Sequence, residues 1–159
     1  MSTDAFLKLG DLKGESVVKD FEKQIQVQSW SWGMNQAGTT HKGTGGGAGK
    51  VDVSDMAVSK TCDTASPTLA LACCNGKHFD EAVLTVRKAG ETPLSFLVIT
   101  MTDVIITNVQ VGGSYGAEEV DEQVGLNFAK YKISYQPQDN KGAKAGGTVD
   151  TEYDIAKNA

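Results

Sequence analysis

The sequence of 159 residues shows no recognisable leader and no long apolar run. Its first ten residues, MSTDAFLKLG, lack the basic start and the apolar stretch of about 7 to 15 residues that mark a secretory signal peptide. Nowhere do about 18 apolar residues follow one another, as a transmembrane helix requires. By the ordinary rules of targeting, these absences predict a cytoplasmic protein that does not insert into a membrane.

Clustered positive charge is also missing. The chain carries 15 Lys and Arg against 20 Asp and Glu, a formal charge of −5. The acidic residues are scattered except around Glu118, Glu119, Asp121 and Glu122. A protein that binds duplex nucleic acid needs clustered Lys and Arg to displace counterions, so a nucleic-acid partner is excluded.

Residues that bind metals or act as nucleophiles are few. The three cysteines, Cys62, Cys73 and Cys74, are odd in number and two are adjacent, which is a poor framework for disulfides. We expect them to be reduced and buried. The two histidines, His41 and His78, form no HxxxH pair and no CxxC occurs, so we expect no metal site and no cofactor.

The glycine-rich run over residues 43–50 invites comparison with a phosphate-binding loop, in which backbone N–H groups and a lysine hold phosphate at the start of a helix. The run does not fit that motif. Thr44 stands where the motif requires glycine, and Val51 follows Lys50 where it requires Ser or Thr. Residues 50–62 also read as a strand rather than a helix. The run therefore predicts a flexible or interface-forming loop and not a nucleotide site.

Most of the chain is patterned as strands. Alternation of apolar and polar residues with a period of two predicts strands over residues 82–87, 105–111 and 149–155. In the second of these segments, the alternation places Ile105 and Val109 on one face and Ile106 on the other. Each strand should have one face on a core and the other toward water or a partner.

In three longer segments the apolar residues change phase partway along. The changes run from Ile25 and Val27 to Trp30, Trp32 and Met34; from Val51 and Val53 to Met56 and Val58; and from Val124, Leu126 and Phe128 to Tyr131, Ile133 and Tyr135. A change of phase requires a bulge or a passage from one packing environment to another, and long strands that bend in this way close a sheet into a barrel. The alternative of two short strands in each segment stays open. We predict a mainly β fold, a β-barrel of two packed antiparallel sheets in which residues 1–159 form one domain.

One short helix interrupts the strands. Ser66 and Pro67 suit the N-cap and the first turn, and Gly76 suits a left-handed C-terminal cap. The segment between them is apolar nearly all round, so we expect the helix to press against the sheet or to plug one end of the barrel.

Residues 29–33 place two tryptophans on one face of a strand and small residues on the other. Trp30 and Trp32 require a core. Ser29, Ser31 and Gly33 then form a narrow, uncharged strip that can pass close to another surface or line a channel. An ordinary solvent-facing strip is the equally open alternative.

Several blocks of the sequence resemble the haemolysin-coregulated protein (Hcp) family of type VI secretion. The blocks follow one another in the family's order and cover nearly the whole chain: Asp4-Ala5-Phe6-Leu7-Lys8-Leu9, Trp30-Ser31-Trp32-Gly33-Met34, Ala48-Gly49-Lys50-Val51, Leu71-Ala72-Cys73 with Gly76-Lys77-His78, Arg87-Lys88-Ala89-Gly90, Asn127-Phe128-Ala129 and Tyr135-Gln136-Pro137.

The resemblance implies a structural protein rather than an enzyme. It implies hexameric rings that stack into a tube, partners in the sheath and spike of the apparatus, and effector proteins held in the ring lumen. The tube would assemble in the cytoplasm and be expelled without a signal peptide. Ser31, with its neighbour Ser29, would face the effector. The ring-stacking loop would comprise Gly38, Thr39, Thr40, His41, Lys42, Gly43, Gly45, Gly46, Gly47 and Gly49.

Two further expectations concern contacts and rival functions. We expect the acidic residues at 118–122 to meet lysines of the next ring, through exposed ion pairs of about 0–1 kcal/mol each. The first rival function is a closed barrel that binds a small apolar ligand as a monomer. The second is an enzyme in which Cys73 or Cys74 acts with His78.

Overall fold

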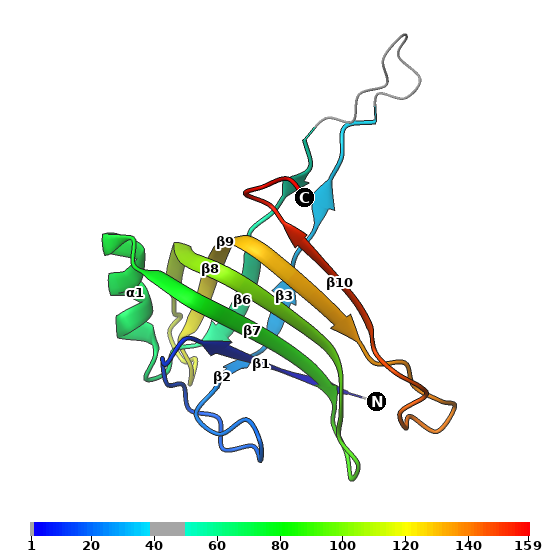
Figure 1. Ribbon diagram of the computed structural model, residues 1–159. Coiled ribbons are helices and arrows are strands. Elements are labelled where there is room, and N and C mark those ends of the chain that lie inside the picture. Colours follow the sequence, from blue (N-terminus) through cyan, green and yellow to red (C-terminus); the bar gives the residue numbers. More distant parts are fainter. Residues whose placement is uncertain (1, 39–49) are drawn as a thin grey trace.

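The computed structural model describes residues 2–38 and 50–159 and consists mainly of strands, with one helix (Figure 1). In chain order the elements are β1 (Thr3–Leu9), β2 (Ile25–Val27), β3 (Ser29–Ser31), β4 (Met34–Asn35), β5 (Asp52–Val53), β6 (Met56–Thr61), α1 (Ser66–Asn75), β7 (His78–Lys88), β8 (Leu94–Gly112), β9 (Asp121–Tyr135) and β10 (Val149–Asp154).

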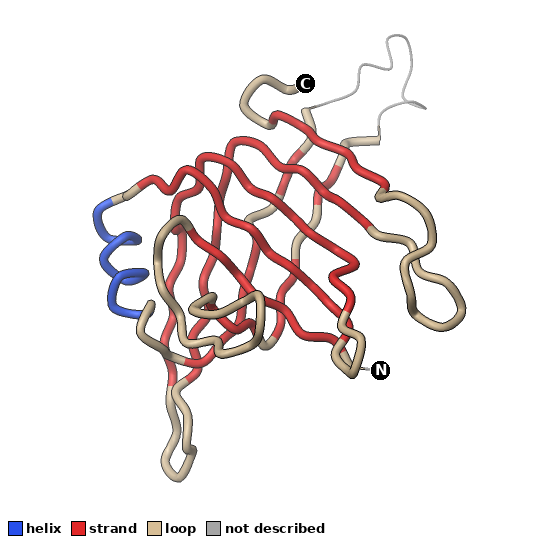
Figure 2. The backbone as a smooth tube through the Cα atoms, turned by 60° about the horizontal axis from the view of Figure 1, so that its bottom comes forward, coloured by secondary structure: helices blue, strands red, loops and turns tan. Residues whose placement is uncertain are grey.

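One antiparallel sheet curls into a barrel, as Figures 1 and 2 show. Its strand order is β2-β1-β7-β8-β9-β6-β3, and β10 pairs with β9 beside this path. The terminal strands β2 and β3 are separated in the chain by Gln28 alone, whose N–H donates to the Ser59 carbonyl oxygen at 2.8 Å. The sheet is therefore nearly closed on itself. The predicted mainly β barrel with one helix is confirmed, and its two layers are parts of one continuous sheet.

The three predicted changes of phase have different structural causes. Before Gln28 the chain pairs with β1, and after it the chain pairs with β6, so the change at 25–34 marks the passage from one side of the barrel to the other. Strand β9 is continuous, but its first half pairs with β6 and its second half with β10. The alternative of separate short strands holds for two of the segments: residues 25–34 are divided into β2, β3 and β4, and residues 51–58 into β5 and β6.

The barrel interior is filled with apolar side chains. Core side chains from β1, β2, β6, β7, β8 and β9 have almost no exposed surface: Leu7, Leu9, Ile25, Met56, Val58, Leu84, Met101, Val104, Ile106, Val124 and Leu126. The predicted phase of β8 was wrong at one point, because Ile106 is buried while Ile105 is only half-buried. The register of β8 against β9 shifts between Ile106 and Asn108, and this bulge at Thr107 returns Val109 to the core side.

Helix α1 packs on the core with one face only. Leu69 and Ala72 are buried, whereas Leu71 is 61% exposed, so the helix is not enclosed on all sides. Gly76 has φ +68° and closes the helix as predicted. The prediction of Ser66 as N-cap was wrong, because Ala65 occupies that position and the Ser66 hydroxyl donates to the Glu122 carboxylate instead, at 2.8 Å. Within the described residues, no helix has the length and apolar character needed to cross a membrane.

A buried ionic cluster lies beneath the start of α1. Lys60 and Glu122 face each other across β6 and β9, form an ion pair and are each 1% exposed. Lys60 Nζ also lies 3.0 Å from Asp63 Oδ1 and 3.2 Å from Ser66 Oγ. The expectation that Glu122 would meet a lysine of another ring was therefore wrong, since its partner is in its own chain. Lys60 lies in phase with the buried Met56 and Val58, and this alternation was the signal that could have placed the lysine in the core.

The cysteines are free but not buried as expected. Cys62 and Cys74 are exposed and Cys73 is half-buried. Cys62 follows the last residue of β6, and Cys74 lies on the outward side of α1. Apolar sequence neighbours were a poor guide to burial here, because a surface helix exposes part of its circumference whatever its composition.

Residues 10–24 form a strap over the outer face of β1 and β7. The Phe21 ring stacks on the buried Phe6 ring with centroids 4.4 Å apart, and the Arg87 guanidinium lies over both rings at 5.3 and 5.6 Å. Gly14 approaches the returning chain so closely that a Cβ there would lie 2.6 Å from the Gln24 carbonyl oxygen. The strap explains why Phe6, which points away from the barrel core, is nonetheless fully buried.

The loop after β9 is organised by polar groups. The Asp139 carboxylate accepts the backbone N–H groups of Ala143 and Lys141 at 2.9 and 2.8 Å, and these bonds lower the pKa of Asp139. The buried Gln136 amide donates to the carbonyl oxygens of Pro137 and Gly146. The loop therefore has a defined shape although most of it is exposed.

Candidate functional site

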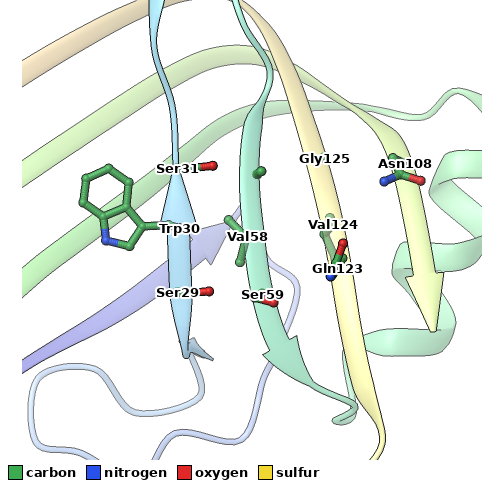
Figure 3. A pocket seen from close by; sticks show the side chains of 10 residues that line it. Ser29, Trp30, Ser31, Val58, Ser59, Asn108, Gln123, Val124 and Gly125 are labelled. Atoms are coloured by element: carbon green, nitrogen blue, oxygen red, sulfur yellow. The ribbon is translucent and has the colours of Figure 1, made fainter. Parts of the chain in front are cut away.

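A shallow groove crosses four strands on the outer face of the barrel (Figure 3). Its volume is about 240 Å³. Strand register sets two rows of small or polar residues across these four strands. The lower row contains Ser29, Ser59, Gln123 and Gln110, and the upper row contains Ser31, Ala57, Gly125 and Asn108. Partners in register point to the same side of a sheet, so each row presents its side chains together.

Two members of the strip predicted from residues 29–33, Ser29 and Ser31, lie in this groove, whereas Gly33 is half-buried and does not line it. Ser29 and Ser31 are exposed, and their hydroxyls point along the groove in Figure 3. Trp30 and Trp32 are half-buried and pack against the core, as two tryptophans in alternate positions require. The sequence therefore predicted correctly which of these side chains are exposed and which pack inward.

The groove is polar but uncharged. Among the described residues that line it, none carries an ionisable side chain. Its chemistry is limited to hydroxyl and amide hydrogen bonds with contact against small side chains. Such a surface provides weak contacts that tolerate different partners, and it lacks the titratable groups that acid–base catalysis needs.

Sequence reasoning missed the groove members on β6, β8 and β9. Ser59, Asn108 and Gln123 are ordinary polar residues in their own segments and no local motif singles them out. They join Ser29 and Ser31 only through the strand register. The alternation of each strand gave their outward orientation, but the order of strands in the sheet was needed to bring them together.

A second polar group continues the same face beyond the groove. The Asp55 carboxylate accepts the Thr107 hydroxyl at 2.7 Å and the Asn127 amide at 2.8 Å. Farther along, His78 Nδ1 lies 2.8 Å from Asp103 Oδ1, and both side chains are more than half exposed. Asp103 has φ +56°, which turns the backbone of β8 at this point.

These polar groups do not assemble a metal centre. No cluster of three or more His, Cys, Asp or Glu side chains suited to a metal ion occurs within residues 2–38 and 50–159. Asp103 supplies His78 with an orienting carboxylate, but both lie at the surface, and among the described residues His78 makes no side-chain hydrogen bond to Cys73 or Cys74.

The predicted ring-stacking loop falls largely outside the described residues. Gly38 is exposed, and Thr39, Thr40, His41, Lys42, Gly43, Gly45, Gly46, Gly47 and Gly49 lie outside the described ranges. The strands on either side of the loop lie within the described residues. Strands β4 and β5 pair through Met34 with Val53 and Asn35 with Asp52. In Figure 1 this pair, in cyan and teal, stands away from the barrel, and we call it the arm.

Comparison with known proteins gives a consistent result. The family model described as "Type VI secretion system effector, Hcp" matches residues 6–135. Protein hcp1 of Pseudomonas aeruginosa is 47% identical over 159 residues, covering 99% of this chain and 98% of that protein. The crystal structure of Hcp1 from Salmonella typhimurium superposes with a TM-score of 0.81 at 36% identity, covering 99% of this chain and 97% of the other.

Two further solved structures support the same assignment. A type six secretion system protein superposes with a TM-score of 0.92 at 27% identity and covers 99% of each chain. A type VI secretion system effector from Yersinia pestis superposes with a TM-score of 0.77 at 32% identity, covering 95% of this chain and 99% of the other. The match in sequence, in length and in fold shows that the chain belongs to the Hcp family of secreted type VI secretion system proteins.

Proposed function

We propose that the chain forms hexameric rings that stack into the inner tube of the type VI apparatus, and that the groove at Ser29 and Ser31 faces effectors in the ring lumen. The observation that carries this proposal is the position of the uncharged groove on the outer face of a barrel whose interior is already filled. A barrel that stores a small apolar ligand needs an interior cavity. Here apolar side chains such as Met101 and Leu126 occupy that space.

Exposed apolar residues favour assembly. Tyr115 is fully exposed, Val111 is 56% exposed and Val149 is 61% exposed, on parts of the surface that a lone chain leaves in water. A closed ring requires that one surface of each subunit meets a different surface of the next. Val111 lies at the end of β8, Tyr115 lies in the β8–β9 connection and Val149 begins β10, so separate surfaces are available for the two sides of such a contact.

Effector binding in this arrangement is weak at each subunit and strong in the ring. Neutral hydrogen bonds contribute about 0.5–1.5 kcal/mol each. Six copies of the groove act on one cargo molecule in a confined lumen, and linked contacts multiply. The proposal assigns no catalytic step to the chain, and no cofactor.

We assign the contact between stacked rings to residues 39–49, the segment that connects the two strands of the arm. The arm leads directly into residues 39–49, whose composition predicts a loop that can adapt to a neighbouring ring. The sheath and the spike are the other partners. The chain acts as one Hcp-like domain over residues 1–159, assembles in the cytoplasm and leaves the cell with the tube.

The test is the variant Ser31→Gln, which places a longer side chain in the groove, with Ser2→Gln as control at an exposed serine outside it. We expect Ser31→Gln to lower the cellular level of at least one effector while electron microscopy still finds open rings, and Ser2→Gln to change neither. Normal effector levels with Ser31→Gln would contradict the cargo assignment. A wild-type chain that stays monomeric by light scattering at high concentration would contradict the ring itself.

A further inference from the structure

The arm is joined to the barrel at a break that occurs in two neighbouring strands at the same level. Strand β3 ends at Ser31 and β4 begins at Met34, while β5 ends at Val53 and β6 begins at Met56. The regular ladder that pairs β3 with β6 therefore stops, and a separate ladder pairs β4 with β5. Because neither ladder spans this gap, other contacts must set the direction of the arm relative to the barrel.

Ser54 closes this gap with four hydrogen bonds. Its N–H donates to the Gly33 carbonyl oxygen at 2.9 Å, and its hydroxyl donates to the same oxygen at 2.9 Å. The hydroxyl also accepts the Gly33 N–H at 3.0 Å, and the Ser54 carbonyl oxygen accepts the Trp32 indole N–H at 3.0 Å. One serine thus replaces the missing ladder bonds, and its side chain makes two of them.

The residues on either side of this joint are fixed to the barrel. Asp55 is held by Thr107 and Asn127, as described above. The Trp32 ring packs edge-on against Tyr131 with centroids 4.8 Å apart, and it contacts Phe128 at 5.9 Å. The arm is therefore anchored on both of its strands, and Ser54 links the two anchors through two bonds of its backbone and two of its hydroxyl.

From this geometry we infer that Ser54 is a positioning residue, which sets the direction of the arm and through it the contact between stacked rings. The inference rests on the proposed function, in which the arm carries the stacking segment. It adds that stacking depends on a joint outside that segment. Loss of the hydroxyl leaves the Ser54 N–H and Trp32 bonds in place, so the arm is expected to loosen while the barrel stays folded.

The experiment compares Ser54→Ala, Ser54→Thr and the control Ser134→Ala. Ser134 is a strand serine whose hydroxyl also makes a hydrogen bond, to Asp150 at 2.6 Å, away from the arm. Amide hydrogen exchange by mass spectrometry follows the peptides that contain residues 33–38 and 50–55. Electron microscopy and sedimentation measure rings and tubes, and release of the protein into the medium measures export.

We expect Ser54→Ala to speed exchange in the arm peptides by roughly fivefold, as the loss of a typical net hydrogen-bond contribution implies. Rings should persist, tubes and export should fall, and Ser54→Thr, which keeps the hydroxyl, should restore all three readouts. Ser134→Ala should match the wild type. Unchanged arm exchange in Ser54→Ala, or normal tubes and export despite a looser arm, would overturn the inference and leave the proposed function standing. A wild-type chain without rings would overturn both.

Discussion

The buried cluster of Lys60, Glu122 and Asp63 offers a sharp test of the fold. Lys60 and Glu122 are each 1% exposed and Asp63 is 10% exposed. Replacing Lys60 by Met keeps the length and most of the volume of the side chain but removes the charge. Both carboxylates then lose their cation, and Glu122 Oε2, which is buried and has no hydrogen-bond partner within the described residues, gains none.

The expected cost of Lys60→Met is large. Removing one partner of a buried ion pair typically costs about 3–5 kcal/mol, because an uncompensated charge remains. For a chain of this size, that corresponds to a fall in melting temperature of about 6–20 °C. The cost is a substantial share of the roughly 5–15 kcal/mol that stabilises a typical protein.

The paired variant separates charge burial from packing. Lys60→Met with Glu122→Leu removes both members of the pair and leaves Asp63 with its bond from the Ala65 N–H at 3.0 Å. Apolar replacement of a whole buried pair is often neutral or stabilising, so the double variant should lose much less than the sum of its single variants.

Urea unfolding at fixed protein concentration measures these free energies, with the concentration held constant because assembly shifts apparent stability. A loss below about 1 kcal/mol for Lys60→Met, which is typical of surface pairs, would refute the burial of the cluster. Losses that simply add in the double variant would refute the direct coupling between Lys60 and Glu122.

Three further predictions concern the strap and the loop after β9. Gly14→Ala places a Cβ 2.6 Å from a backbone oxygen and should cost about 1–3 kcal/mol in urea unfolding, whereas Gly112→Ala, with nothing within 4 Å, should cost close to nothing. Phe21→Ala removes the ring stacked on the buried Phe6 and should cost about 2 kcal/mol, with faster amide exchange across residues 10–24; unchanged exchange there would contradict the strap. Backbone N–H groups lower the pKa of the Asp139 carboxyl in the folded loop. Its contribution to loop stability should therefore be present above the ordinary Asp pKa of about 3.9 and be lost as the pH falls through the lower pKa of the folded state. The amide proton chemical shifts of this loop, followed by NMR, should titrate with that lower midpoint, and Asp139→Asn should abolish the titration.

The sequence predicted features that depend on local patterns. The outward serines and inward tryptophans of residues 29–32 follow from alternation alone, and the end of the helix follows from Gly76, which adopts the left-handed conformation that glycine allows. The passage of the chain between two sides of the barrel was also visible as a change of phase. These are properties of neighbouring residues, so a single sequence carries them.

Features that depend on partners distant in the sequence were missed. The bulge at Thr107 is a property of the register between β8 and β9, and alternation along β8 alone cannot reveal it. Ser66 was assigned to the helix cap because its neighbours suit a cap, but Glu122 supplies a stronger, charged partner for its hydroxyl. The same carboxylate was assigned to the surface because its own segment is acidic. Its burial follows from the position of Lys60 directly across the sheet.

In the proposed function, the chemistry of the groove limits how tightly one subunit can hold cargo. A single groove that makes about three neutral hydrogen bonds gains roughly 1.5–4.5 kcal/mol before the cost of association, so one subunit should bind cargo no more tightly than about the millimolar range. Retention then requires several grooves acting together. Because no ionisable side chain lines the described groove, salt should screen little of this interaction. Effector retained on purified rings should therefore remain bound when sodium chloride is raised from about 0.1 to 0.5 M, measured by co-sedimentation. Release over that range would show that charged residues outside the groove hold the cargo, and nanomolar binding to a single subunit would contradict the multivalent mechanism.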